Sequence, residues 1–225
     1  MLKQLSLKNS SLRHKLLQLT LLPLALTAVG FALMAAYWTT SYTDRQLYMK
    51  VSADLSVARG TLDFMQQEQE NILAQLASSY EFRTNLQLGN SRAILVQLNE
   101  VKQSRSFDFL RFISAEQLPF MREQSLTELR NQLLNKQSLK GIAVLDAKEI
   151  EMIKVGLSDQ SKINLIDTPR AVPTDKERES RSMVLRAFVP VLDDFGELIG
   201  ILDAGTILNN TTTAVDRIRD LVYGE

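Results

Sequence analysis

The most regular hydrophobic pattern in the chain lies near its C-terminal end. Residues 184–192 and 198–207 are both apolar and rich in β-branched side chains, and Asp193, Asp194 and Gly196 stand between them. Two such runs joined by a short polar segment predict a β-hairpin, in which Gly196 is free to adopt the positive φ of a tight turn. We expect this hairpin to form the centre of a mixed α/β domain.

A second pattern predicts a membrane span. Residues 16–37 contain no charged side chain in 22 positions, which as a helix measures roughly 33 Å, about one hydrocarbon core. Tyr37 and Trp38 stand at its far end, where interfacial aromatic residues are expected. Lys3, Lys8, Arg13 and Lys15 precede it, so the positive-inside rule places the N-terminus in the cytoplasm and the main domain outside. The alternatives are a cleaved signal peptide and a buried core helix.

The segment after the span predicts one long helix. Residues 41–79 contain no proline, and their only glycine is Gly60. Apolar side chains recur at heptad spacing with Gln69 as the one polar position of the seam: Tyr48, Val51, Leu55, Ala58, Leu62, Met65, Ile72 and Leu76. Two interpretations stay open, a dimerisation stalk and a helix packed along its own domain, and both can apply to different parts of it.

The middle of the chain predicts alternating short elements. We expect helices over residues 81–101, broken at 89–91 with Ser91 as an N-cap, and over 120–134 and 147–155. Strands are expected over residues 107–113, 141–145 and 163–166. An exposed loop over 168–179 and a final amphipathic helix over 212–223 complete the prediction.

Composition narrows the chemistry. The chain has no cysteine and one histidine, His14, which lies in the basic leader. The main domain therefore lacks disulfides, a Cys nucleophile, a Ser-His-Asp triad and a His-ligated zinc. The first fifteen residues carry +4 and the remainder 22 basic against 26 acidic residues, or −4, which argues against nucleic acid as a partner. We expect no cofactor and no catalytic residues.

The order of these elements resembles the Cache domain of bacterial membrane sensors. The resemblance rests on a hairpin motif made of Ala187, Val189, Pro190, Val191, Asp193, Gly196 and Gly200. Residues 168–174 resemble a loop that precedes this strand in one Cache subgroup, and residues 208–210 with 215–219 resemble its exit helix. The resemblance to the Cache domain spans residues 15–225. It implies an α+β fold, in which a transmembrane helix and a long amphipathic helix precede a PAS-like antiparallel sheet with flanking helices.

The resemblance also implies a function. Cache domains bind a small metabolite outside the inner membrane and signal to a histidine kinase, chemoreceptor or cyclic-dinucleotide enzyme. The second Cache module, the second membrane helix and the output domain are not in this sequence, so we expect the first module of a truncated double-Cache protein. Trp38 is the only tryptophan and lies at the membrane, so the signature of amino-acid-binding members has no counterpart here and no amino-acid ligand is implied.

Five charged residues are candidates for ligand binding. Arg186 stands among apolar neighbours in a predicted strand, where it suits a ligand carboxylate; the alternative is an internal salt bridge to Asp203 on the partner strand. Asp203 is itself a candidate, because it is a charge in an otherwise apolar strand. Arg111 and Asp108 lie on opposite faces of another strand, so one of them points to the more buried side; an ion pair or exposure is the alternative. Arg170, in a proline-bounded loop, either closes over a pocket or lies on the surface.

These observations divide the chain into parts. We expect a cytoplasmic leader (1–15), a transmembrane helix (16–38), a long membrane-proximal helix (40–80), a Cache/PAS-like sensor domain (81–210) and an exit helix (211–225). The expected function is small-molecule sensing by a single-pass protein of the bacterial inner membrane, homodimeric through its long helix. The alternatives are a membrane-anchored scaffold and an anchored periplasmic enzyme.

Overall fold

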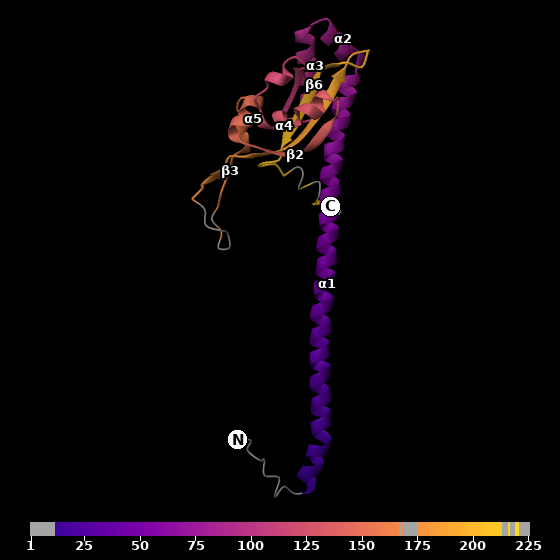
Figure 1. Cartoon of the computed structure of the whole chain (residues 1–225). Helices are drawn as coiled ribbons and strands as arrows, with labels where there is room; N and C mark the ends of the chain where they lie inside the picture. Colours follow the sequence, from indigo (N-terminus) through magenta and orange to yellow (C-terminus); the bar gives the residue numbers. More distant parts are fainter. Residues whose placement is uncertain (1–11, 167, 169–174, 213–215, 217–218, 221–225) are drawn as a thin grey trace. The chain divides into compact units, whose positions relative to one another are not determined.

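The computed structural model describes residues 12–166, 168, 175–212, 216 and 219–220 (Figure 1). The chain divides into two compact units, Met1–Ser56 and Val57–Glu225. The first helix, α1 (Leu12–Ser78), contributes residues to both units. The sheet and all other helices belong to the second unit, and they are described there.

The first unit contains the predicted membrane segment. Among the described residues, one helix is long and apolar enough to cross a membrane, and its most apolar 18-residue stretch has a mean hydropathy of 2.1. Large apolar side chains in it are exposed, for example Leu24 at 65% and Phe31 at 76%. A core helix would bury them, so the buried-helix alternative is wrong.

The second unit is built on a four-stranded antiparallel sheet in the order β1-β6-β5-β2. The strands are β1 (Phe109–Ser114), β2 (Leu139–Leu145), β5 (Ser182–Leu192) and β6 (Leu198–Ile207). β5 and β6 are the predicted hairpin, and they occupy the two central positions. Gly196 has φ +79°, and Asp193 accepts the backbone N–H groups of Phe195 and Glu197 at 2.8 Å, which closes the turn as predicted.

Helices cover both faces of this sheet (Figure 1). One face packs on α1, α2 (Tyr80–Gln87) and α3 (Ser91–Ser104) through a core of Leu73, Phe82, Leu98, Ala187, Val189, Leu202 and Ala204. The other face packs on a 3₁₀ turn (Leu118–Phe120), α4 (Gln124–Leu134), α5 (Ala147–Ile153) and α6 (Leu157–Ser161). The mixed α+β arrangement with an antiparallel sheet and flanking helices is confirmed.

Several predicted boundaries differ from the structure. α4 begins at Gln124 and not at residue 120, because Pro119 lies in the 3₁₀ turn and the backbone is extended at Met121. The helix predicted over 147–155 ends at Ile153, where Lys154 is extended, and a second short helix, α6, follows Gly156, whose φ is +88°. The N-cap of α3 is Asn90 and not Ser91, since the Asn90 side chain accepts the Ala93 N–H.

The C-terminal part of the sheet domain carries a small second sheet. It pairs β3 (Ile163–Asn164) with β4 (Arg178–Glu179), so the predicted loop over 168–179 ends in a short strand. Of the helix predicted over 212–223, Asp216, Arg219 and Asp220 are described and helical. Its other residues from 213 onward lie outside the described part of the chain.

The upper part of α1 packs against the sheet. Thr61, Gln69, Leu73 and Ala77 are buried, and the predicted stripe residues Ile72 and Leu76 are partly buried beside them. Leu73 was not in the predicted heptad seam, because a helix lying on a sheet buries a wider face than one paired with a second helix. Gln69 donates through Nε2 to the Thr206 hydroxyl of β6 at 2.9 Å, so this polar position has a partner within the domain. Pairing of the lower part in a dimer stays a prediction.

We predict that Gly200→Ala destabilises the domain, whereas Gly141→Ala does not. A Cβ on Gly200 would overlap with the Ile113 carbonyl oxygen and lie 2.5 Å from the Phe112 ring, whereas one on Gly141 would meet no atom within 4 Å. Overpacking of this kind costs about 1–3 kcal/mol, and each kcal/mol lowers the melting temperature of a domain of this size by about 2–4 °C. Thermal unfolding of the full chain in detergent measures both; equal melting temperatures would contradict the packing described for Gly200.

Candidate functional site

A buried ion pair joins the two central strands. Arg186 of β5 is only 3% exposed and Asp203 of β6 is fully buried. Arg186 donates through Nε to Asp203 Oδ1 and through Nη2 to Asp203 Oδ2, both at 2.8 Å. This two-point arrangement fixes the guanidinium plane against the carboxylate. The pairing of Arg186 with Asp203 is the internal salt bridge that the sequence left open as the alternative to ligand binding.

Two further charged residues complete the buried cluster. Arg111 of β1 donates to Asp203 Oδ2 through Nε at 2.8 Å and to Glu123 Oε2 through Nη2 at 2.6 Å. Arg186 also reaches Glu123 Oε2, at 3.1 Å. Two arginines therefore share two carboxylates, which we call the arginine–carboxylate cluster (Arg111, Glu123, Arg186 and Asp203).

The cluster connects the sheet to the helices on the same face. Arg186 Nη1 donates to the hydroxyl of Ser125 at 2.8 Å, in the first turn of α4. The backbone N–H of Ser125 donates to Glu149 of α5 at 2.9 Å, and its hydroxyl donates to the same carboxylate oxygen. Glu149 is buried. A continuous hydrogen-bonded path thus runs from β6 through Arg186 to α4 and α5.

Local structure explains why these groups meet. Glu123 occupies the N-cap position of α4 but makes no capping hydrogen bond, since its side chain turns to the arginines instead. In the sheet, Arg111 lies directly opposite Asp203, and Arg186 lies between two glycines, Gly205 on β6 and Gly141 on β2. The absence of side chains on both neighbours leaves room for a large cation over the sheet.

Within the arginine–carboxylate cluster, opposite charges offset the cost of burying each charged group. Burial by itself raises the pKa of Asp203, but the charges and hydrogen bonds of Arg186 and Arg111 outweigh it and hold that pKa below its usual range. Burial opposes the charged form of both arginines, and the carboxylates overcome this and raise the arginine pKa values above their ordinary range. All three groups are charged at neutral pH.

The two sides of Arg186 differ. On the Gly205 side, the Phe109 ring occupies the space that a Cβ would need, and its centroid lies 5.7 Å from the guanidinium carbon. The Phe188 ring lies closer, at 4.5 Å. On the Gly141 side no atom lies within 4 Å of a Cβ position.

That open space belongs to a cavity, which we call the Gly141 cavity. Its volume is about 330 Å³, and it lies between α4 and β2. Its lining combines apolar side chains with Ser125 and Arg186 at one end: Ser125, Leu129, Gln132, Leu139, Lys140, Gly141, Ile142, Ala143, Arg186 and Phe188. A small molecule in it would contact Arg186 directly.

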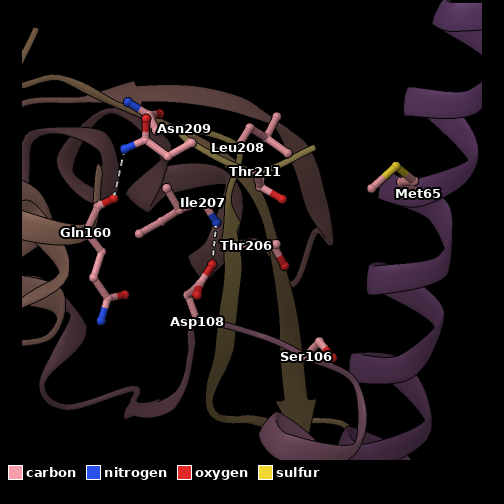
Figure 2. Close-up of a pocket in the computed structure, with 10 residues that line it drawn as sticks. Met65, Ser106, Asp108, Gln160, Thr206, Ile207, Leu208, Asn209 and Thr211 are labelled. Carbon is pink, nitrogen blue, oxygen red and sulfur yellow. Dashed lines mark hydrogen bonds between the residues drawn. The ribbon is translucent and has the colours of Figure 1, made fainter. Parts of the chain in front are cut away.

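A second cavity of about 330 Å³ contains Asp108 (Figure 2). Figure 2 shows Asp108 beside the end of β6, with Met65 of α1 on the opposite wall. The Asp108 carboxylate accepts the backbone N–H of Ile207 at 2.6 Å, so it supports the strand end. It does not belong to the arginine–carboxylate cluster.

The asparagine side chains that line this second cavity also make hydrogen bonds within the protein. Asn209 donates through Nδ2 to the carbonyl oxygens of Ser161 and Arg181, at 2.7 and 2.9 Å. Asn210 donates to the carbonyl oxygen of Lys162 at 2.7 Å. These bonds tie the segment after β6 to α6 and to the residue before β5.

The structure therefore brings together three of the five predicted residues, Arg186, Arg111 and Asp203, and places Asp108 elsewhere. Arg170 lies outside the described residues. Sequence reasoning missed Glu123, Ser125, Glu149 and Gly141. The one available signal was an acid at the start of a predicted helix, and it pointed to capping rather than to ion pairing.

Comparison with known proteins gives little further guidance. No family model and no curated protein matches the chain. Among solved structures it is similar to the periplasmic domain of Vibrio cholerae LuxQ, with 13% sequence identity and a TM-score of 0.49 over 76% of this chain and 70% of that chain. We draw no functional conclusion from a likeness at this level, and the Cache assignment stays a prediction.

We predict that Asp203 makes the domain sensitive to acid. Because its pKa in the folded state is lowered below the unfolded value of about 3.9, its stabilising contribution is complete above that pH and is lost as pH falls toward the folded-state pKa. Asp203→Asn should therefore lower the melting temperature at pH 7, but lose less additional stability than the wild type between pH 5 and pH 3.

The control for this experiment is Glu179→Gln. Glu179 also has a lowered pKa, of about 2, because its partner Arg181 donates hydrogen bonds to it, but the pair lies at the surface where solvent screens it. This variant should follow the wild type over the whole pH range. An acid profile of Asp203→Asn parallel to that of the wild type would show that the buried cluster does not set the acid stability.

Proposed function

We propose that this chain is the small-molecule-sensing region of a membrane-anchored signal-transduction protein, with the Gly141 cavity as its ligand site. The observation that carries the proposal is that the buried Arg186 lines the Gly141 cavity. A desolvated guanidinium whose other contacts are all made by protein groups faces a cavity large enough for a metabolite. Pockets of about 300 Å³ or more with a few fixed polar groups among apolar walls are typical of ligand sites.

The path from the cavity to α1 supports a sensing role. Arg186 contacts the ligand space on one side and Asp203 of β6 on the other. β6 also carries Thr206, which accepts the hydrogen bond of Gln69 from α1. A ligand that moved Arg186 would therefore shift the position of β6, the strand to which α1 is hydrogen-bonded. The same helix, α1, also contains the segment suited to crossing a membrane.

The membrane orientation and the type of signalling protein are proposed from the sequence. The basic leader favours a cytoplasmic N-terminus and an extracytoplasmic sheet domain in a bacterial inner membrane. The Cache-like order of elements favours a histidine kinase or a chemoreceptor as the protein to which this region belongs. In this proposal the chain itself performs no catalysis, since its part is to bind and to transmit.

The first test is a thermal-shift screen of the full chain in detergent against a metabolite collection. A ligand present at 100 times its Kd stabilises the folded state by about 2.7 kcal/mol, which raises the melting temperature by several degrees. Gly141→Leu should abolish the shift without lowering the melting temperature of the free protein, because its side chain enters the open space over Arg186. Gly141→Ala serves as the matched control that keeps most of the cavity. A shift that survives Gly141→Leu would place the ligand elsewhere.

A scaffold or dimerisation role is the second candidate, and the exposed stripe on α1 favours it. Tyr48 and Leu55 follow the heptad spacing and are 78% and 65% exposed. Seven-residue spacing of this kind is the pattern by which two helices pair. Dimerisation and ligand sensing are compatible, whereas a protein that only dimerises would give no ligand shift.

We predict that Leu55→Cys forms a disulfide-linked dimer in membranes under mild oxidation. The chain has no other cysteine, so the product reports on this position alone. Asp63→Cys, on an exposed helix position outside the stripe, is the control and should crosslink less. Equal crosslinking of both variants on non-reducing gels would contradict a specific pairing of the stripe.

A further inference from the structure

The number of donors left on Arg186 limits what the Gly141 cavity can bind. A guanidinium has five N–H groups. The single N–H of Nε and one of Nη2 bind Asp203, the second N–H of Nη2 binds Glu123, and one N–H of Nη1 binds Ser125. Four are thus engaged within the protein. Among the described residues, no protein group accepts the second N–H of Nη1.

One donor is a poor match for a carboxylate. Arginine recognises carboxylates by placing two parallel N–H groups on the two oxygens, and the Nε–Nη2 edge that suits this geometry is occupied by Asp203. The Nη2 atom on the remaining edge is shared with Glu123. A ligand carboxylate would have to displace a protein carboxylate and leave it buried without its partner, which is strongly unfavourable.

The charge around the cavity points the same way. Three carboxyl side chains, those of Glu123, Glu149 and Asp203, surround the two guanidinium groups of Arg111 and Arg186. Lys140 lines the cavity, but its amine is held by Glu70 at 2.7 Å and by Gln67, both on α1 at the opposite face of the sheet. Among the described residues that line the cavity, the two cations, Arg186 and Lys140, are both bound by protein carboxylates, so they offer an incoming anion little compensation.

The remaining lining is suited to an uncharged molecule. Leu129, Leu139 and Phe188 form apolar walls, and the polar side chains in the lining are those of Ser125, Gln132, Lys140 and Arg186. We infer that the Gly141 cavity binds a neutral small molecule that has an apolar body and one hydrogen-bond-accepting group, such as an amide or ketone carbonyl, and that it discriminates against carboxylates. This inference rests on the proposed function, since it names the class of ligand for the same cavity.

A matched pair of probes tests the inference: 3-phenylpropanamide and 3-phenylpropanoate, which share one carbon skeleton and differ in charge. Both are titrated at pH 7.5 into the full chain in detergent, with binding followed by ligand-observed NMR and by thermal shift. The amide should bind at least about tenfold tighter, because burying an unpaired carboxylate is the costlier transfer. Gly141→Leu should abolish binding of whichever probe binds.

The outcomes separate the inference from the proposed function. Equal or tighter Gly141-dependent binding of the carboxylate overturns the ligand class but leaves a ligand-sensing cavity intact. If neither probe binds, the metabolite screen decides the ligand class, through the compound whose thermal shift is lost in Gly141→Leu. A neutral compound supports the inference, and a carboxylate overturns it. A screen with no Gly141-dependent compound overturns both.

A charge-neutralising variant tests the electrostatic reason. Glu149→Gln keeps an acceptor for Ser125 but removes one negative charge, so the ratio of the carboxylate Kd to the amide Kd should fall several-fold. Glu179→Gln, at the surface, is the control and should leave that ratio unchanged. Glu123→Gln provides a second neutralisation if Glu149→Gln does not fold. An unchanged ratio in every folded cluster variant would overturn the charge argument.

Discussion

The cost of burying the Arg186 guanidinium is the constraint on which the rest of the sheet domain depends. An ion taken from water into a protein interior loses several kcal/mol of hydration, and only well-placed charges and hydrogen bonds restore it. Asp203 supplies the paired carboxylate from the adjacent strand, and Glu123 supplies the second. The position of α4 follows from this requirement, because its first residues must deliver Glu123 and Ser125 to the same cation.

The two glycines beside Arg186 lie in different surroundings, one in the packed core and one at an open cavity. Gly205 allows the Phe109 ring to close one side, so that side is part of the core. Gly141 has no such neighbour, so the other side faces a cavity. The difference lies in the strand order: β6 is central and has β1 beyond it to contribute Phe109, whereas β2 is the edge strand.

The sequence predicted the elements whose stability is local and missed the groups that distant segments bring together. The hairpin of β5 and β6 was recognisable because alternation and the Asp193–Gly196 turn are encoded in adjacent residues. Arg186 and Asp203 were recognisable as charges in apolar strands, and their pairing was among the alternatives considered. Glu123 and Glu149 were not recognisable, because nothing near them in sequence indicates that α4 and α5 pack on the arginine face.

The long helix illustrates the same limit. Heptad spacing correctly indicated that α1 has an apolar face, but it did not show that Leu73 would be its most buried residue or that Gln69 would bond to β6. The spacing of apolar residues indicates which helix positions are buried. It does not indicate which surface covers them, because here that surface is the sheet. The face that buries Leu73 was therefore not available from the helix sequence alone.

The Gln69–Thr206 hydrogen bond has a mechanical consequence for α1. A slide of one helical turn, about 5.4 Å, would carry Met65 or Leu73 to the height of Thr206 and leave the buried Gln69 amide without the Thr206 hydroxyl. Among the described residues Gln69 Oε1 already lacks a hydrogen-bond partner, so little compensation is at hand. The bond therefore opposes translation of α1 along the sheet, and only displacements that keep Gln69 beside Thr206 preserve it.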